Sequence, residues 1–213
     1  MIQSVRRCLV LCAHTDDEFG CAGTVARLVD AGAEVRYLAL STCEKSVPDG
    51  LPRDVLVHEC REATARLGVA PEHVELGPFE VREFPRDRQA ILEHLVALRR
   101  EWTPDLVLLP SSTDHHQDHA TVHQEGVRAF KHATLLGYEL PQNEVAFHGA
   151  AFVALSERHL ETKLHALAAY QSQAFRSYST DTFVRSLATI RGVQAGTTYA
   201  EAFEPIRLVV PLG

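Results

Sequence analysis

Two short polar stretches hold many of the side chains in this sequence that could bind a metal ion. Ala13–Glu18 reads AHTDDE, and Ser111–His119 reads SSTDHHQDH. An imidazole and a carboxylate from one stretch, with an imidazole from the other, would form a three-ligand zinc site that leaves a fourth position for water. Zinc lowers the pKa of such a water to ~7, which suits hydrolysis at neutral pH. His14 and Asp17 are three residues apart, so a tight turn could point both at one ion.

The spacing does not decide between the two aspartates of the first stretch. Either Asp16 or Asp17 could be the ligand, and the other could accept a proton from water as a general base. Simpler explanations exist, because acidic residues before a helix often cap it and a lone histidine cluster is often a solvated loop. The presence of both stretches in one chain favours a functional site.

The elements around these stretches predict where they lie. Strands are expected at 7–12, 34–40, 73–76, 106–109, 150–155 and 206–210, and helices at 19–31, 53–67, 87–102, 119–131, 157–170 and 180–189. Strand–helix alternation predicts an α/β fold of three layers, Rossmann-like, with helices on both faces of a mostly parallel sheet. Ligands of such folds bind beyond the carboxyl ends of the strands. Both polar stretches follow strands, so we expect them on the same rim.

Size and composition predict one domain spanning residues 1–213, located in the cytoplasm. The net charge of −7 argues against a nucleic-acid partner, which would require a cationic surface. The apolar run after Arg6 and Arg7 is about six residues long, far below the ~18 of a transmembrane segment, and it makes a poor signal peptide. Five cysteines without a CxxC pair indicate reduced thiols.

At these residues the sequence resembles the LmbE/PIG-L family of zinc-dependent de-N-acetylases. The first family motif is AHPDDE and the second is HPDH, which His116–His119 matches as HQDH. Thr15 and Gln117 replace the two motif prolines, and because proline supplies no ligand, the turns can differ while a metal site survives. Weaker matches extend the resemblance over most of the chain, at Lys163, 170–173, 191–192 and 199–203.

The resemblance implies a role for each motif residue. The zinc ligands would be His14, Asp17 and His119. Asp16 would be the general base, His116 would stabilise the oxyanion and protonate the leaving amine, and Asp118 would orient an imidazole. Adjacent His115 makes the register ambiguous, but the spacing of His116 to His119 matches the motif.

Other candidates are weaker. Glu44 follows the second strand and could contact substrate hydroxyls, or it could be an exposed loop carboxylate. Arg191 could bind a phosphate near the rim or form a surface ion pair. His123 lies four residues after His119, but Ala120 stands where a zincin has its glutamate, so His123 is not expected to bind metal.

The sequence therefore predicts a zinc enzyme that removes the N-acetyl group from an amino sugar, free or linked to a nucleotide or lipid. One alternative is a zinc amidase acting on another small amide, such as a thiol-sugar conjugate. A second is a non-catalytic module that binds metal or sugar. The family resemblance is also compatible with a homo-oligomer.

Overall fold

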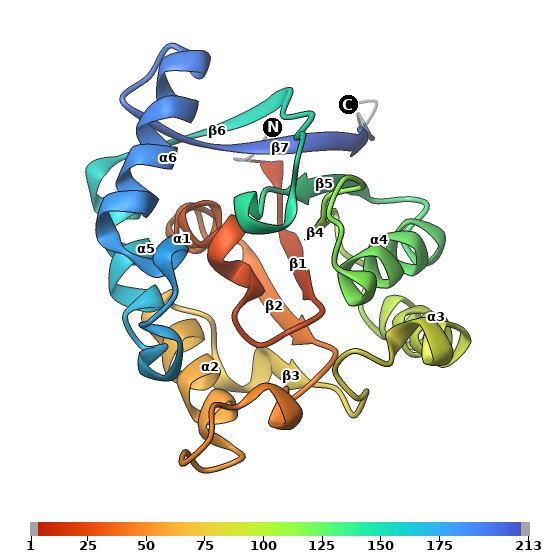
Figure 1. The fold of residues 1–213 in the computed structure, drawn as a ribbon. Coiled ribbons are helices and arrows are strands. Elements are labelled where there is room, and N and C mark those ends of the chain that lie inside the picture. The colour runs from red at the N-terminus through yellow and green to blue at the C-terminus, as the bar shows by residue number, and fades with distance from the viewer. Residues whose placement is uncertain (1–3, 210–213) are drawn as a thin grey trace.

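The computed structural model describes residues 4–209, and these form a seven-stranded sheet (Figure 1). Its strands are β1 (Arg7–Cys12), β2 (Glu34–Ala39), β3 (Val74–Leu76), β4 (Leu106–Pro110), β5 (Thr134–Tyr138), β6 (Ala151–Leu155) and β7 (Tyr199–Arg207). They are ordered β3-β2-β1-β4-β5-β7-β6. The first five run parallel, whereas β7 is antiparallel to both β5 and β6. The predicted α/β class with a mostly parallel sheet is confirmed.

Helices cover both faces of the sheet. They are α1 (Ala22–Asp30), α2 (Val55–Arg66), α3 (Phe84–Glu101), α4 (Gln117–Ala129), α5 (Glu157–Leu167) and α6 (Asp181–Ala195). One hydrophobic cluster joins the sheet to α1, α2, α5 and α6, and another joins it to α3 and α4 (Figure 1). The predicted three-layer arrangement is therefore present.

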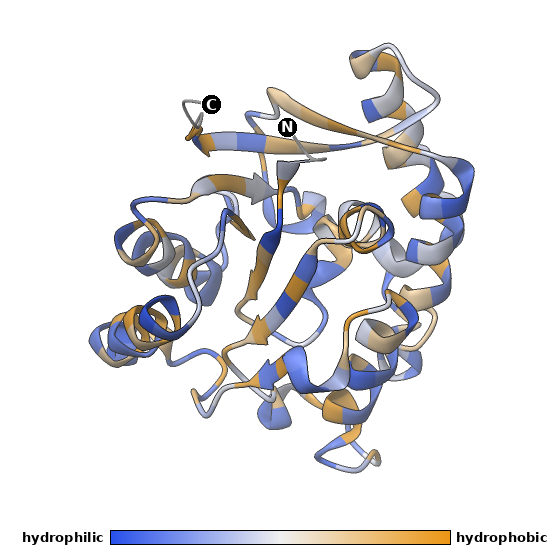
Figure 2. Cartoon of the chain, turned by 180° about the vertical axis from the view of Figure 1, so that it is seen from behind, coloured by the Kyte–Doolittle hydropathy of each residue, from blue (hydrophilic) through white to orange (hydrophobic). Residues whose placement is uncertain are grey.

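Strand β1 supplies side chains to both cores, because successive residues of a strand point to opposite faces. Cys8, Val10 and Cys12 belong to the first cluster, while Leu9 and Leu11 belong to the second. All five are fully buried. In Figure 2 the central strands carry stretches of apolar colour, whereas the helices mix apolar and polar colour. A strand buried on both faces has a continuous apolar sequence, and for this reason β1 can be predicted from the sequence.

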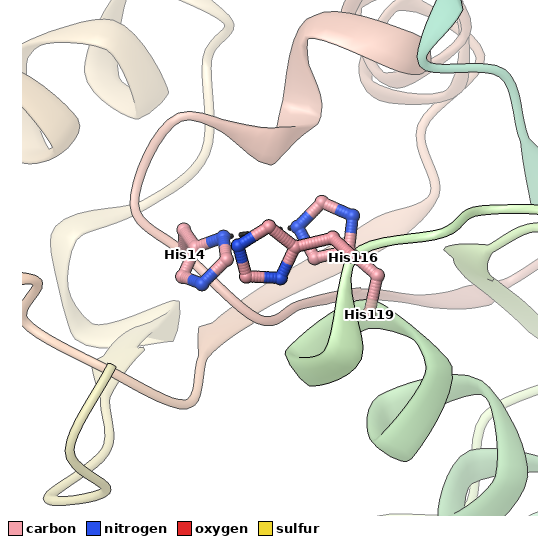
Figure 3. A group of neighbouring side chains, drawn as sticks. All are labelled: His14, His116 and His119. Atoms are coloured by element: carbon pink, nitrogen blue, oxygen red, sulfur yellow. Dashed lines mark hydrogen bonds between the residues drawn. The ribbon is translucent and has the colours of Figure 1, made fainter. Parts of the chain in front are cut away.

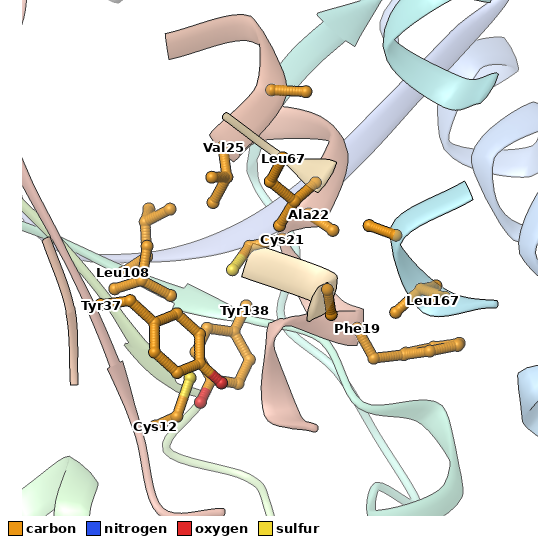
Figure 4. Packing of buried hydrophobic residues seen from close by; sticks show 14 of the residues in the cluster. Cys12, Phe19, Cys21, Ala22, Val25, Tyr37, Leu67, Leu108, Tyr138 and Leu167 are labelled. Atoms are coloured by element: carbon orange, nitrogen blue, oxygen red, sulfur yellow. The ribbon is translucent and has the colours of Figure 1, made fainter. Parts of the chain in front are cut away.

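The first core reaches the end of β1 that leads into the site. Figure 4 shows the rings of Tyr37 and Tyr138 beside Cys12, with Phe19 further along the cluster. The Tyr138 hydroxyl donates to the carbonyl of Leu11 across 3.2 Å. This packing holds β1, β2 and β5 together just below the first polar stretch.

The sheet order reverses between β1 and β4. From β1 the chain continues to α1 on one face, and from β4 it continues to α4 on the other. A crevice opens at such a switch point beyond the carboxyl ends of the two strands. The two polar stretches follow these strands, as the sequence predicts.

Two strands differ from the sequence-based expectation. β5 was not predicted, partly because Gly137 weakens its strand pattern. A Cβ on Gly137 would lie 2.9 Å from the Ser111 Cα, so close approach of the neighbouring loop requires glycine there. The final strand was expected at 206–210 but is β7, at Tyr199–Arg207, and Val210 lies outside the described residues. β7 is recognisable mainly through its pairing with β5 and β6.

Two expectations from composition concern the cysteines and the membrane. All five cysteines are free and buried, which confirms the prediction of unpaired thiols. No helix within residues 4–209 combines the length and apolar character needed to cross a bilayer.

A buried carboxylate fixes the start of α1. Glu201 on β7 accepts hydrogen bonds from the backbone amides of Gly23 (2.9 Å) and Thr24 (2.6 Å). Its Oε1 also pairs with the Lys163 ammonium at 2.7 Å, and both side chains are about 5% exposed. This network holds α1, α5 and β7 together behind the first polar stretch, which gives Lys163 and Glu201 a structural role.

We predict that Glu201→Gln lowers the free energy of unfolding by about 3 kcal/mol, because it leaves the Lys163 charge buried without its partner. Urea denaturation followed by circular dichroism measures the change. Glu161→Gln is the matched control, since Glu161 pairs with Arg185 at the exposed surface and little change is expected. Equal stability of the two variants would contradict the prediction. Replacing Lys163 with Met in the Glu201→Gln protein should recover part of the loss.

Candidate metal centre

Three histidines from the two polar stretches meet at the switch point of the sheet (Figure 3). His14 follows β1, His116 is the N-cap of α4, and His119 lies in the first turn of that helix. Each offers a ring nitrogen, and these atoms lie within 4.8 Å of one another. The group could therefore hold a metal ion.

Asp17 forms a tighter triangle with two of these histidines. Its Oδ1 lies 3.5 Å from His14 Nδ1 and 3.3 Å from His119 Nε2, and the two nitrogens are 2.9 Å apart. Tetrahedral zinc with bonds of ~2.0–2.1 Å places neighbouring ligand atoms roughly 3.3–3.4 Å apart. The donor set of two imidazoles and one carboxylate fits zinc in both chemistry and spacing.

The backbone of the first stretch holds Asp17 in place. Its Oδ2 accepts hydrogen bonds from the amides of Ala13 (2.9 Å) and His14 (2.8 Å), which leaves Oδ1 facing the histidines. Although burial raises the pKa of Asp17, the charges and hydrogen bonds of His119 and His14 hold it well below its usual range. The alternative that the acidic run caps a helix is not observed for Asp16, which makes no side-chain capping bond.

Two further carboxylates orient the imidazoles. Asp118 Oδ2 lies 3.0 Å from His14 Nε2, and Asp114 Oδ2 lies 2.6 Å from His119 Nδ1. Each carboxylate can accept a hydrogen bond from the N–H of the outer ring nitrogen, which leaves the inner nitrogen to bind a cation. The sequence analysis expects Asp118 to orient an imidazole, and the contact with His14 would allow that role. Asp114 was not singled out from the sequence, and the only available signal was that metal-binding histidines commonly have a carboxylate partner.

The surrounding carboxylates raise the pKa values of His14 and His119. Burial lowers the pKa of His119, but the Asp17 charge and the hydrogen bonds with Asp114 and Asp17 raise it to about 10. Similarly, burial opposes protonation of His14, yet Asp17 and Asp118 raise its pKa to about 9. The site therefore favours positive charge between these side chains.

His116 differs from the other two histidines. Its Nδ1 accepts a hydrogen bond from the Asp118 amide at 3.2 Å, so the proton of the neutral ring is on Nε2. Burial, followed by the charges of His14 and His119, lowers its pKa. In this tautomer the neutral ring has a hydrogen-bond donor at Nε2. His115 is exposed and is not among the residues that line the cavity, which favours the register chosen from the sequence.

A cavity of about 660 Å³ opens over the histidines, and Asp16 also lines it. Burial and the adjacent Asp17 charge raise the pKa of Asp16. The lining also includes Arg82, Asn143 and Arg176, which are not predicted from the sequence. They come from loops after β3, β5 and α5, and no local motif marks them.

Two weaker candidates for substrate binding, Glu44 and Arg191, do not line this cavity. Glu44 is exposed in the 3₁₀ turn Glu44–Ser46 and is not one of the residues that line the cavity. Arg191 donates from Nε to Glu139 Oε2 at 2.9 Å, and both side chains are mostly buried. Arg191 therefore takes part in an ion pair away from the site.

Comparisons with known proteins agree with the motifs. Residues 9–130 match the model of a family described as GlcNAc-PI de-N-acetylase (PIG-L). The uncharacterized deacetylase YaiS of Escherichia coli is 27% identical over 171 residues, which cover 77% of this chain and 90% of that protein. Diacetylchitobiose deacetylase of Thermococcus kodakarensis is 27% identical over 225 residues, covering 92% and 82% of the two chains.

A solved structure shares the fold. N,N'-diacetylchitobiose deacetylase from Pyrococcus horikoshii superposes with a TM-score of 0.79 at 21% identity, covering 95% of this chain and 84% of that one. The matched family span contains both polar stretches. The resemblance inferred from the motifs is therefore confirmed.

We predict that Asp114→Asn weakens zinc binding about 10–100-fold, because a neutral amide oxygen is a weaker hydrogen-bond acceptor for the His119 ring than the carboxylate is. Competition with a chromophoric chelator measures the affinity. Asp54→Asn, at an exposed aspartate outside the cavity, is the matched control and should bind zinc as the unaltered protein does. Unchanged affinity in a correctly folded Asp114→Asn protein would show that this contact does not support the metal.

Proposed function

Because this chain belongs to the GlcNAc-PI de-N-acetylase (PIG-L) family, we propose that it removes the N-acetyl group from an amino sugar or amino-sugar conjugate by zinc-dependent hydrolysis. As a member of that family the chain is a deacetylase, an enzyme that hydrolyses an amide bond. Activity of a relative on diacetylchitobiose supports the amino-sugar substrate. The observation that carries the zinc proposal is the convergence of His14, Asp17 and His119 beside the Asp16 carboxylate.

His14, Asp17 and His119 would hold the zinc ion. Their inner ligand atoms face one another at 2.9–3.5 Å, whereas the ring nitrogens of the three histidines are spread over 4.8 Å. The tautomer of His116 also favours Asp17 as the third ligand. Zinc bound there would supply a Lewis acid for the acyl oxygen and lower the pKa of a water molecule.

Asp16 is proposed as the general base. Its carboxylate lines the cavity, and burial together with Asp17 raises its pKa, which makes it a better proton acceptor. It would accept the proton of the attacking water and pass it to the amide nitrogen as the carbon–nitrogen bond breaks. The products are then acetate and a free amine.

His116 is proposed to stabilise the oxyanion. The Nε2–H of its neutral ring can donate to the acyl oxygen as negative charge develops. This role needs no imidazolium, in keeping with the lowered pKa of His116. Asp114 and Asp118 would act through His119 and His14, by keeping their rings in the required orientation.

The alternative of a zinc amidase acting on another small amide, such as a thiol-sugar conjugate, would use the same groups. A substrate panel separates it from the amino-sugar proposal. The comparisons favour an enzyme over a non-catalytic metal- or sugar-binding module.

We expect the zinc-loaded protein to release acetate from N-acetylglucosamine or diacetylchitobiose, and Asp16→Asn to lower kcat about 10²–10⁴-fold with zinc still bound. Acetate release by a coupled assay and metal content by mass spectrometry test both statements. Asp54→Asn is the control for an exposed aspartate. Hydrolysis of a thiol-sugar amide alone would favour the alternative substrate, and full activity of Asp16→Asn would remove Asp16 from the mechanism.

A second comparison distinguishes Asp17 from His116 as the third ligand. We expect Asp17→Asn to lose tight zinc binding, and His116→Ala to keep about one zinc per chain while kcat falls about 10²–10³-fold. Exposed His115 provides the matched control, His115→Ala, which should behave as the unaltered protein. Loss of zinc in His116→Ala, with zinc retained in Asp17→Asn, would instead identify a three-histidine site.

A further inference from the structure

Positively charged side chains gather at the edge of the sheet opposite the candidate metal centre. The metal centre lies beyond the carboxyl ends of β1 and β4, whereas α3 and α4 lead into the amino ends of β4 and β5. These two helices pack side by side on one face of the sheet (Figure 1). β4 has five residues, and at ~3.3 Å per residue it separates the two edges by ~16 Å. A ligand at the amino ends would therefore bind away from the metal centre.

Two hollows adjoin at this edge and are lined by basic side chains. Their volumes are about 400 and 450 Å³. The basic residues that line one or both are Arg99, Arg100, Arg128, Lys131, His132 and Arg207. Arg99 and Lys131 line both hollows, which makes the basic surface continuous. Within residues 4–209, no aspartate or glutamate lines either hollow, although the chain as a whole has a net charge of −7.

Two of these cations have no partner in the part of the chain that the structure describes. Across residues 4–209, the side chains of Arg100 and Lys131 form neither an ion pair nor a hydrogen bond, and both are exposed. Arg128 differs, because its Nη1 is paired with Glu125 Oε2 at 2.6 Å. Positive charges that are gathered without counter-charges attract anions from solution. Arg100 and Lys131 are therefore available to bind one.

Two other arginines are held in place by the end of α4. Arg99 Nη1 donates to the Ala129 carbonyl at 2.7 Å, and Arg207 Nη1 donates to the Phe130 carbonyl at 3.2 Å. These carbonyls lie at the negative end of the helix dipole, which explains why cations are stable there. Each bond uses one of the five N–H groups of a guanidinium. Both arginines can therefore bind an anion with their other donors, and their restricted positions lower the entropy lost on binding.

The shape and chemistry of the hollows indicate what would bind. Their volumes lie in the range of ~300–1,000 Å³ that is typical of small-molecule sites. Guanidinium and ammonium groups both bind phosphate, the first through paired hydrogen bonds. Because the cations are spread over two adjoining hollows, a ligand with two phosphate groups can contact cations of both. Pro104 in one hollow, and Val96 and Val127 in the other, offer apolar surface to the part of the ligand that carries the phosphates.

We propose that this edge of the sheet binds a small molecule bearing two phosphate groups, held by Arg100 and Lys131 and by the two arginines that are bonded to the end of α4. The site uses neither the candidate zinc ligands nor Asp16, so the inference does not depend on the proposed function. Helix α4 carries His119 in its first turn and ends at this site, so the ligand would contact the same helix that supports the metal centre.

Isothermal titration calorimetry on the zinc-loaded protein at fixed ionic strength tests the proposal. The probes are fructose, fructose 6-phosphate, fructose 1,6-bisphosphate and adenosine diphosphate, which carry no phosphate, one phosphate, two separated phosphates and two adjacent phosphates. We expect at least one of the two diphosphates to bind about tenfold or more tightly than fructose 6-phosphate, because the second phosphate contacts cations of the second hollow. The better of the two probes identifies the spacing of the phosphates.

Two variants test the residues. Arg100→Ala and Lys131→Ala should each weaken binding of that diphosphate about tenfold or more, because each removes a charge-assisted hydrogen-bonding group. Both side chains are exposed and have no partner within residues 4–209, so neither substitution removes a contact that holds the fold. Arg61→Ala is the matched control, since Arg61 is an exposed arginine of α2 that lines neither hollow, and it should leave the affinity unchanged. Thermal unfolding verifies that each variant is folded.

Three results would overturn the inference. The first is a diphosphate affinity no greater than that of fructose 6-phosphate. The second is a diphosphate preference that survives in both variants or disappears when zinc is removed, since the anion would then bind elsewhere, in the latter case at the metal centre. The third is tighter binding of a hexaglutamate peptide than of either diphosphate, which would identify an acidic protein segment as the ligand. Acetate release by the unaltered protein tests the proposed function separately and has no bearing on this site.

Discussion

The two carboxylate oxygens of Asp17 contact different groups, and the arrangement of the site depends on this difference. One oxygen is bound by the backbone amides of Ala13 and His14, and the other faces the inner nitrogens of His14 and His119. The first pair of bonds closes the turn after β1, and the second brings that turn to the start of α4. A single carboxylate thus connects local backbone shape with the meeting of two segments about a hundred residues apart.

The sequence allowed this meeting to be predicted because its causes are local. β1 and β4 are continuous apolar runs, each followed by polar side chains, and parallel strands place their carboxyl ends on one edge. His14, Asp17 and His119 could therefore be placed on the same rim before the order of strands was known. The family resemblance, rather than the spacing, separated the expected roles of Asp16 and Asp17.

Residues whose roles depend on distant contacts could not be assigned in this way. Asp114 is significant because it bonds the outer nitrogen of His119, and Arg82 because its amide bonds Asp118 from another loop. The role of Glu201 could not be assigned from the sequence for the same reason, since its partners on α1 and α5 are far away along the chain. β5 could not be predicted because glycine at position 137 is explained by the close approach of the Ser111 backbone and not by strand propensity.

The five buried thiols have a practical consequence. Burial is the largest influence on each of them and raises the pKa of all five, so almost no thiolate, the nucleophilic form, exists near neutral pH. Alkylating reagents should react slowly with the folded chain. A single cysteine introduced at an exposed position on α6 could then carry a fluorophore or spin label selectively, with the native sequence left intact.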